Sequence, residues 1–400
     1  RAQDGQRRQR LLRGSRRRTR LPPGGRHLSR CHRNPGVLRQ LHLGRGGLPH
    51  VLPDRLHRAS PDAGEGARDP AVLKTVEAFR DLLPPFPEPP LTIAVSECLT
   101  GAPVRYDGGH RASAWPGDEL EDLYELRPIC PEVGIGLGVP RPPIRLVGAA
   151  GAPRAIGVED PSVDVTDRLR AYAGKRLPDL DDVDGYVFKA RSPSCGLEGV
   201  ALHPEPDGPA APKGTGLFAA EIARARPALP LEDGENLFEP GALESFVTRT
   251  FVHAFWRRTT AAGIDAPRLI AFHSACKYLV MAHDVSAYRR LGRLLADLSG
   301  DVEATARQYL GALMRGLEAR PTRNSHTNVL QHLQGYLKDT TAASERRTVG
   351  ASIERYRDGE TALETPLHDL QLRLREAGAR YAFDQYYLHV PRVAVVHRAL

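Results

Sequence analysis

The sequence predicts an α/β domain built on a parallel sheet, followed by an all-α helical domain, and three observations lead to this expectation. Between residues 88 and 228, short apolar runs rich in β-branched residues alternate with helical segments and Gly/Pro-rich loops, a pattern typical of parallel sheets. Between residues 240 and 395, apolar residues recur at i, i+3, i+4 and i+7, which predicts amphipathic helices. A chain of 400 residues also exceeds what one hydrophobic core usually holds.

The segment 1–65 is set apart by its composition. Residues 1–58 carry sixteen Arg and two acidic residues, a net charge of +14, and no aromatic residue. Such a segment buries too little apolar surface to become ordered, so we expect a disordered basic tail. A mistranslated extension is the interpretation we prefer, and an RNA-binding arm and a transit peptide remain open. Residues 59–400 have 40 basic and 46 acidic side chains. Their net charge of −6 gives little support for binding nucleic acid.

The elements of the α/β domain are expected in a regular order. Each predicted strand is a short apolar run, and each ends in a loop rich in turn residues, where the ligands of such sheets bind. The expected strands are at 91–95, ending at Ile129, and at 185–190. The expected helices are at 118–126 and 163–175, and a further helix at 71–83 lies inside a helix-and-linker segment at 66–87. KGTGLF (213–218) is expected to be a glycine turn that enters a helix, with Thr215 as the N-cap.

The helical domain contains seven periodic segments and no expected strand. The segments are 243–258, 271–284, 285–298, 302–317, 327–339, 344–359 and 367–378. A polar stripe near 325–336 could line a ligand groove, although a solvated helix face is the simpler alternative. Its members are Ser325, Asn328, His332 and Tyr336, which His273, His283 and His326 could join.

Three of the five cysteines share one sequence context. Cys98, Cys130 and Cys195 each directly follow a predicted strand and lie in a Gly/Pro-rich turn. Parallel strands would bring the three sulfurs to one edge of the sheet, where they could hold zinc or an iron–sulfur cluster with one open position. There is no CxxC pair, so three small buried hydrophobic residues remain the alternative.

The cysteine usage and the hydropathy also bear on the compartment. An odd number of widely spaced cysteines argues against a secreted disulfide scaffold and favours a reducing cytoplasm. No apolar run approaches the roughly 18 residues of a membrane-spanning helix. We therefore expect a cytoplasmic protein with no membrane partner, and the sequence leaves its oligomeric state open.

Four motifs carry a family resemblance over about 90–228. They are SECLTGAPVRYDGGH (96–110), CPEVGIGLGVPRPP (130–143), KARSPSCG (189–196) and KGTGLFAAEI (213–222). Together they resemble domain-of-unknown-function family 523, which includes the thiouracil desulfidases. The resemblance implies a 4Fe-4S cluster held by Cys98, Cys130 and Cys195, with one iron open to the sulfur of a thiocarbonyl substrate. FHSACKYLVMAHD (272–284), NSHTNVLQHLQGYLKD (324–339) and DQYYLHVP (384–391) resemble family 1722, which adds no established chemistry.

The resemblance also implies acid–base residues beside the cluster. Ser192, three residues before Cys195, matches the catalytic serine of the desulfidase motif. Glu132 is the first candidate for the catalytic carboxylate because it lies two residues after Cys130, and Glu97 is the second.

Three charged residues in the same loops are candidates for binding the substrate. Arg105 and Arg141 could orient an anionic or carbonyl-bearing ligand, or could form salt bridges within the loops. Asp107 in YDGG is first of all a turn residue.

The expected activity is the removal of sulfur from a small thiolated nucleobase or a related thiocarbonyl. Replacing C=S by C=O requires attack of water at carbon, a proton donor and a thiophilic site for the sulfide. The alternative is a non-catalytic nucleic-acid-associated or redox-sensing iron–sulfur protein.

Overall fold

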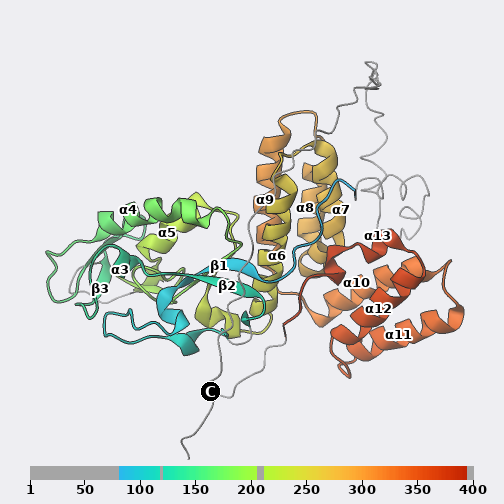
Figure 1. The fold of residues 1–400 in the computed structure, drawn as a ribbon, viewed down its shortest axis with the longest axis horizontal. Helices are drawn as coiled ribbons and strands as arrows, with labels where there is room; N and C mark the ends of the chain where they lie inside the picture. Colours follow the sequence, from blue (N-terminus) through green and yellow to red (C-terminus); the bar gives the residue numbers. More distant parts are fainter. Residues whose placement is uncertain (1–80, 118–119, 205–210, 394–400) are drawn as a thin grey trace, which may run out of the picture. The chain divides into compact units, whose positions relative to one another are not determined.

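The computed structural model describes residues 81–117, 120–204 and 211–393, and its α/β part contains two sheets. The larger has the order β2-β1-β5-β8, and all of its neighbouring strands are parallel. Its strands are β1 (Leu91–Ser96), β2 (Tyr124–Ile129), β5 (Tyr186–Phe188) and β8 (Leu231–Asp233). The prediction of a parallel-sheet α/β part followed by a helical part is therefore confirmed (Figure 1).

Strand β1 is covered on both faces, which explains its almost continuous apolar sequence. Leu91, Ile93 and Val95 enter one hydrophobic core, while Ala94 enters another on the opposite face. A strand covered on both faces is typical of parallel sheets, because the crossover helices pack against the sheet. β1 pairs with β2 along its whole length, from Leu91 opposite Tyr124 to Ser96 opposite Ile129.

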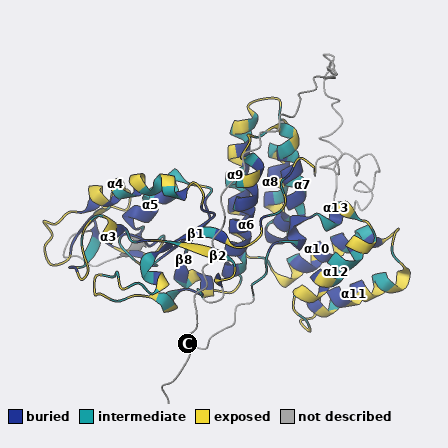
Figure 2. Cartoon of the chain, in the orientation of Figure 1, coloured by how far each residue is buried: buried dark blue, intermediate teal, exposed yellow. Residues whose placement is uncertain are grey.

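Helices cover the two faces of this sheet. Helices α4 (Thr166–Arg176) and α5 (Leu217–Ala225) supply Ala173, Phe218 and Ile222 to the core that contains Ala94 and Ile129. Helix α6 (Ala242–Thr260) supplies Phe246 and Phe251 to the core that contains Leu91 and Ile93. In Figure 2, the dark blue that marks buried residues is concentrated on α5 and α6.

The second sheet follows the loop after Cys130 and has the order β4-β3-β6-β7. Strands β3 and β6 are parallel, and each pairs with an antiparallel outer neighbour. Its strands are β3 (Ile144–Val147), β4 (Arg154–Gly157), β6 (Val200–His203) and β7 (Ala211–Gly214). This sheet anchors the chain that follows Cys195, because β6 begins five residues after that cysteine.

The helical part matches the expected segments closely. The helices after α6 are α7 (Ala266–His283), α8 (Val285–Leu294), α9 (Val302–Leu317), α10 (Arg323–Gln334), α11 (Ala343–Arg357), α12 (Glu364–Glu376) and the short α13 (Arg380–Phe383). No strand occurs among the described residues beyond β8. None of the helices in the described ranges combines the length and apolarity needed to cross a membrane.

Side-chain N-caps mark the starts of four of these helices. Asp265, Asp284 and Asp301 accept hydrogen bonds from backbone N–H groups in the first turns of α7, α8 and α9. Thr322 and Ser325 form a reciprocal capping box at the start of α10. These caps satisfy N–H groups that an α-helix leaves unpaired, and they place the helix boundaries.

The prediction of a helix at 118–126 was wrong. Residues 118 and 119 lie outside the described residues, and from Tyr124 the chain is strand β2. Pairing with β1 along six positions and burial of Tyr124 and Ile129 override the local helical pattern.

Other elements were absent from the prediction or cannot be compared with it. The strands of the second sheet and β8 were not anticipated, because three- and four-residue strands among Gly and Pro resemble loops. The loop after Cys130 also contains one helical turn, α3 (Pro131–Gly134). The expected tail at 1–65 and most of the expected helix at 71–83 lie outside the described residues, and its last three residues form a turn.

A buried ionic contact joins α6 to the chain just before β5. Asp184 has a side chain only 1% exposed, and it accepts hydrogen bonds from Arg257 at 2.9 and 3.2 Å. The Nδ1 atom of His253 lies 2.9 Å from the same carboxylate. A buried carboxylate with three such contacts holds the helix in register against the sheet.

Replacement of Asp184 tests this contact. We expect Asp184→Ala to lower the free energy of unfolding by about 1–3 kcal/mol, because Arg257 and His253 lose a buried acceptor. Urea denaturation followed by circular dichroism measures the change. The matched control is Asp182→Ala, since the Asp182–Arg127 pair is exposed and is expected to contribute about 1 kcal/mol or less. Equal destabilisation by the two variants would contradict the assignment.

Candidate functional site

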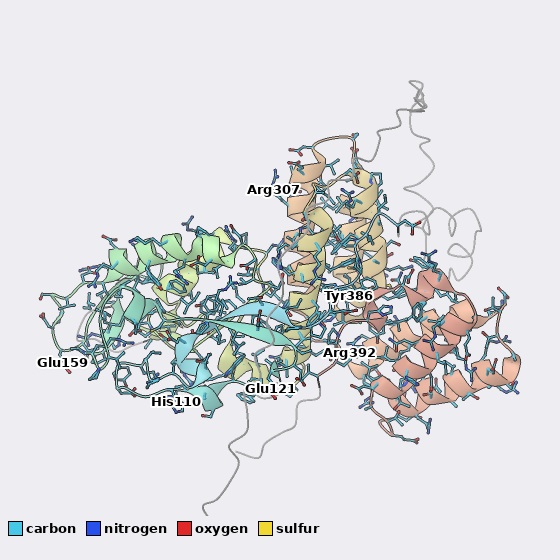
Figure 3. The ribbon with its side chains drawn as sticks, viewed as in Figure 1. His110, Glu121, Glu159, Arg307, Tyr386 and Arg392 are labelled. Carbon is cyan, nitrogen blue, oxygen red and sulfur yellow. The ribbon has the colours of Figure 1, made fainter. Side chains whose placement is uncertain are left out.

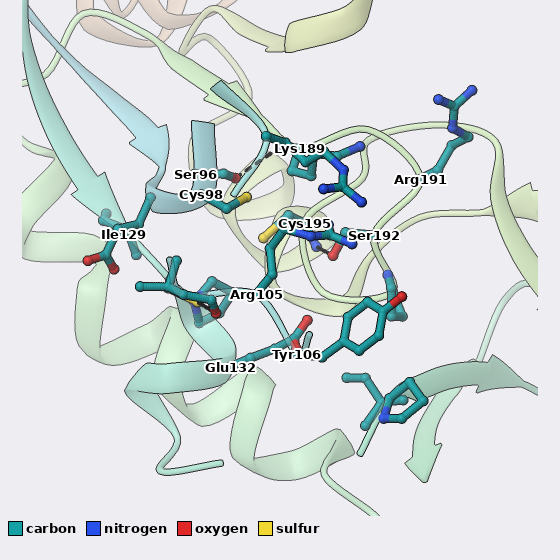
Figure 4. A pocket seen from close by; sticks show the side chains of 18 of the residues that line it. Ser96, Cys98, Arg105, Tyr106, Ile129, Glu132, Lys189, Arg191, Ser192 and Cys195 are labelled. Carbon is teal, nitrogen blue, oxygen red and sulfur yellow. Dashed lines mark hydrogen bonds between the residues drawn. The ribbon is translucent and has the colours of Figure 1, made fainter. Parts of the chain in front are cut away.

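Three loops at the carboxyl ends of β1, β2 and β5 meet around one cavity of about 370 Å³ (Figure 4). Cys98, Cys130 and Cys195 all line it, together with Glu132 and Ser192. The cysteines are separated by 32 and 65 residues in sequence, so the parallel sheet brings them together, as the sequence predicts. All three are free thiols.

Each cysteine is held by a hydrogen bond within its own loop. Cys98 lies in the 3₁₀-helix η2 (Glu97–Thr100), and its carbonyl accepts a hydrogen bond from the Arg111 N–H at 2.7 Å. Cys130 is the N-terminal flanking residue of α3, and its carbonyl accepts from the Gly134 N–H at 2.9 Å. Cys195 is buried, and its N–H donates to the Ser192 hydroxyl at 3.2 Å.

The thiols lie close enough to influence one another electrostatically. Burial, followed by negative charge at Cys130, raises the pKa of the Cys98 thiol to about 11, and Arg105 and Lys189 act in the opposite direction. Burial and the charge at Cys130 also raise the pKa of the Cys195 thiol well above its usual range. Isolated thiols in this cavity would therefore be protonated at neutral pH, and a thiophilic cation would displace their protons on binding.

Three cysteine sulfurs are the donors that this cavity offers to a metal group. Zinc with one open position and an iron–sulfur cluster with one iron lacking a protein ligand both use such a donor set. Within the described ranges, no three His, Cys, Asp or Glu side chains are already arranged around a single ion.

Glu132 ties two of the cysteine loops together. Its Oε1 accepts a hydrogen bond from the Ser194 hydroxyl at 2.9 Å, and its Oε2 accepts from Arg141 at 2.8 Å. The Arg141 side chain is only 4% exposed and also donates to the Val104 and Gly138 carbonyls. The loop after β2 and the loop after β5 are thus joined through one carboxylate that lines the cavity.

The hydroxyl oxygen of Ser192 already accepts two hydrogen bonds from the backbone. Its Oγ accepts hydrogen bonds from the N–H groups of Ser194 at 3.3 Å and Cys195 at 3.2 Å. A hydroxyl has two acceptor sites and one donor, so its proton remains available to a group in the cavity. Arg191, just before it, has φ of 59°, the one left-handed non-glycine backbone in the part of the chain that the structure describes.

The charged residues of the first loop lie at the cavity but differ in their contacts. Arg105 lines the cavity and pairs with Asp107 at 3.3 Å. Asp107 accepts a hydrogen bond from the Gly109 N–H at 3.0 Å, and this bond, together with Arg105, lowers the pKa of its carboxyl. Asp107 therefore holds the loop and Arg105 in place. Glu97 also lines the cavity, beside Cys98.

Lys189 connects the third loop to β1 and to the segment after β8. Its backbone N–H donates a hydrogen bond to the Ser96 hydroxyl at 3.0 Å, the dashed contact in Figure 4. Its Nζ donates to Glu235 at 2.8 Å and to the Ala190 carbonyl at 2.7 Å. Lys189 lines the cysteine cavity, and the charge of its ammonium group is partly balanced by Glu235.

The glycine turn before α5 positions the Cys195 loop. The first N–H groups of α5 donate to that loop: Leu217 to the Pro193 carbonyl at 3.0 Å and Phe218 to the Ser194 carbonyl at 3.0 Å. A Cβ at Gly216 would lie 2.5 Å from the backbone of Ser194, so only glycine fits there. The N-cap is Gly216, which corrects the prediction of Thr215. The Thr215 hydroxyl instead donates to the Leu197 carbonyl at 2.9 Å.

Asp233, at the end of β8, holds the chain just after Cys195. Its two carboxylate oxygens accept hydrogen bonds from the N–H groups of Leu197 at 3.1 Å and Glu198 at 3.4 Å. Burial raises the pKa of the Asp233 carboxyl to about 6, although these hydrogen bonds act in the opposite direction.

Several residues of the cavity wall were not among the predicted site residues. Ser194 lies inside the RSPSCG motif, so its position beside Cys195 was the available signal. Ser96 and Tyr106 lie inside the motif at 96–110, which was their available signal, whereas Arg111 follows the motif and only the folded loop brings it to the cavity.

Two protein families match parts of the chain. The family described as 2-thiouracil desulfurase matches residues 93–234, which contain the three cysteines and all the cavity residues named above. A protein family of unknown function, DUF1722, matches residues 277–391, in the helical part.

Individual proteins are similar to one or the other portion. Uncharacterized protein YbgA of Escherichia coli (strain K12) is 32% identical over 157 residues, which is 38% of this chain and 90% of YbgA. Uncharacterized protein YbbK of Bacillus subtilis (strain 168) is 34% identical over 110 residues, which is 26% of this chain and 72% of YbbK. The solved structure of the [4Fe-4S]-dependent thiouracil desulfidase TudS has 26% sequence identity and a TM-score of 0.31, and the match covers 39% of this chain and 98% of that one.

The raised pKa of Asp233 predicts a pH-dependent loss of stability. The folded carboxyl titrates at about 6 and its ordinary value is 3.8, so folding takes up a proton between these values. Asp233 therefore contributes its full stabilisation below about pH 4. This stabilisation is lost as pH rises through about 6, which lowers the free energy of unfolding by about 2–3 kcal/mol.

Asp233→Asn imitates the protonated carboxyl and tests this dependence. We expect the variant to match the natural protein at pH 4.5 and to be more stable at pH 7, with the free energy of unfolding measured by urea denaturation at both values. A difference between the two proteins that stays constant with pH would show that Asp233 does not titrate in this way.

Proposed function

Because the chain belongs to the 2-thiouracil desulfurase family over residues 93–234 and carries a DUF1722 domain over 277–391, we propose that it removes sulfur from a thiolated nucleobase or a related thiocarbonyl. The single observation that carries the proposal is the meeting of three cysteines, Glu132 and Ser192 around one cavity inside the family segment. The reaction replaces C=S with C=O: water adds to the carbon, the C–S bond breaks, and sulfur leaves as hydrogen sulfide.

Cys98, Cys130 and Cys195 are the residues proposed to hold a 4Fe-4S cluster. Three thiols in one cavity, with no fourth cysteine among the described residues that line it, fit a cluster that leaves one iron without a protein ligand. When bound, such a cluster supplies a Lewis-acidic, thiophilic iron. Arg105 and Lys189 lie where they offset the negative charge of the thiolates, since both lower the pKa of Cys98.

Glu132 is proposed to accept the proton of the attacking water. Its carboxylate lines the cavity, and each oxygen already accepts a hydrogen bond, from Ser194 on one side and Arg141 on the other. Each carboxylate oxygen has a second lone pair, so a water in the cavity can still donate to it. Arg141 positions this carboxylate, and Glu97 is the second candidate for the same role.

Ser192 is proposed to donate a proton to the departing sulfur. Both of its acceptor sites are directed at backbone N–H groups, which fixes the hydroxyl and leaves its proton for the cavity. Of the two arginines considered for substrate binding, Arg105 is proposed to act on the substrate, because the donors of Arg141 are taken by Glu132 and two backbone carbonyls. Arg105 would orient the carbonyl or anionic part of the ligand, with Asp107 fixing the arginine.

The cluster proposal predicts the metal content of the purified protein. We expect anaerobic purification to yield a brown protein with about four irons per chain. Cys98→Ser, Cys130→Ser and Cys195→Ser should each lose most of this iron. Cys276→Ser is the matched control and should retain it, because Cys276 lies in the helical core. A colourless or zinc-loaded natural protein would contradict the proposal.

The catalytic proposal predicts separate effects on the cluster and on turnover. We expect Ser192→Ala to keep its iron and to release sulfide from 2-thiouracil about 100-fold more slowly, since it loses a proton donor. Ser162→Ala, on an exposed turn, is the control and should remain fully active. Sulfide and uracil are measured together, because hydrolysis yields them in equal amounts.

The same assay separates the catalytic function from the alternative. An iron-loaded protein that releases no sulfide from any thiolated base, and that binds RNA or DNA tightly, would favour the non-catalytic nucleic-acid-associated or redox-sensing protein. Unchanged activity in Ser192→Ala would remove that residue from the mechanism while leaving the cluster proposal intact.

A further inference from the structure

Tyr106 lines the cysteine cavity and has no role in the proposed reaction. It is 41% exposed, and Phe238, also 41% exposed, is the other exposed aromatic residue in the part of the chain that the structure describes. Phe238 does not line the cavity, whereas Tyr106 is the one aromatic side chain among the described residues that do. An exposed ring in a cavity offers an apolar face that a ligand can cover.

The backbone of Tyr106 is fixed between two of the cysteine loops. Its carbonyl accepts a hydrogen bond from the Arg141 N–H at 2.9 Å, which joins the first loop to the second. The Arg105 N–H donates to the Gly109 carbonyl at 3.2 Å and closes a tight turn that ends just before His110, labelled in Figure 3. The position of the ring is therefore set by its own loop.

The side chain of Arg105 also contacts the ring. Its guanidinium carbon lies 5.2 Å from the centroid of the Tyr106 ring, within the range of a cation–π interaction. The same guanidinium pairs with Asp107 at 3.3 Å, so the arginine is itself anchored. Figure 4 shows Tyr106 and Arg105 among the side chains at the cavity. A ring that is held in this way loses little freedom when a ligand covers it.

Apolar groups extend the surface that the ring offers. Among the residues of the cavity wall they include Val104, Ile129, Pro143 and Ile144. A ligand that fills this cavity therefore covers apolar surface as well as the polar groups of the proposed reaction. A heterocycle has this character, because its ring faces are apolar and its edges carry polar groups.

We propose that Tyr106 stacks on the ring of a planar, aromatic heterocyclic thione and selects such substrates over open-chain or puckered thiocarbonyls. This inference rests on the proposed function, because it specifies which thiocarbonyl the cysteine cavity accepts. Aromatic side chains stack on every nucleobase, since each base has a π-face. A saturated ring has no such face and gains less from the contact. The ring rather than the hydroxyl makes the contact, so phenylalanine can replace the tyrosine.

Calorimetric titration of the anaerobically purified full chain with uracil and with 5,6-dihydrouracil tests the contact without turnover. The two ligands carry the same N–H and C=O groups, but dihydrouracil lacks the aromatic face. We expect the natural protein to bind uracil about ten-fold more tightly than dihydrouracil, and Tyr106→Ala to bring this ratio close to one. Tyr106→Phe should keep the ratio because it retains the ring. Phe238→Ala is the matched control and should also keep it, because this equally exposed residue lies outside the cavity.

Sulfide release supplies a second measurement. With 2-thiouracil, we expect Tyr106→Ala to raise KM about ten-fold and to change kcat by less than about three-fold, because stacking is made in the ground state as well. With 5,6-dihydro-2-thiouracil, the same variant should leave KM unchanged.

Absence of saturable uracil binding, a ratio near one in the natural protein, or an unchanged ratio in Tyr106→Ala overturns the inference. Sulfide release with an unchanged ratio would leave the proposed function standing without the stacking contact. Uracil binding that depends on Tyr106 in a protein that releases no sulfide would remove the proposed function and keep the binding site.

Discussion

The candidate site depends on the parallel alignment of β1 with both of its neighbours. Since β2, β1 and β5 run in the same direction, their carboxyl ends open on one edge of the sheet and release their loops side by side. Each of these loops delivers one cysteine, so three residues far apart in sequence reach one cavity. The second sheet and the start of α5 then hold the third loop, which carries Cys195, by backbone hydrogen bonds.

The cavity wall is organised by polar residues that cross between loops. Glu132 joins the second loop to the third through Ser194, and Lys189 joins the third loop to β1 through Ser96. Asp233 holds the chain after Cys195 from the far side. Buried polar groups of this kind contribute little net stability on average, but they fix geometry, because any displacement leaves a donor or an acceptor unsatisfied. The site is therefore shaped in advance of ligand binding.

How much could be predicted from sequence follows from the range of the interactions involved. The strands at 91–95 and 185–190 and the seven long helices are encoded by local apolar patterns, and their predicted positions agree with the structure. The end of β2 at Ile129 was predicted as well, but its start at Tyr124 and the second sheet depend on pairing with distant strands, which no local pattern reveals.

The same distinction applies to the site. The cysteines, Ser192 and Glu132 could be identified because each lies in a motif at a strand end. The hydrogen bond from Ser194 to Glu132 spans 62 residues, so it could be found only in the folded chain.

The packing of α6 against the sheet has a consequence for cooperativity. One hydrophobic core contains Leu91 and Ile93 of β1 together with Phe246, Phe255 and the helices beyond, so no apolar boundary separates the α/β part from the helical part. Parts that share a core gain their burial free energy jointly and tend to melt in a single transition. The packing of the helical part therefore also stabilises the cysteine loops. Loss of packing around α6 would lower the stability of β1 and of the loop that carries Cys98.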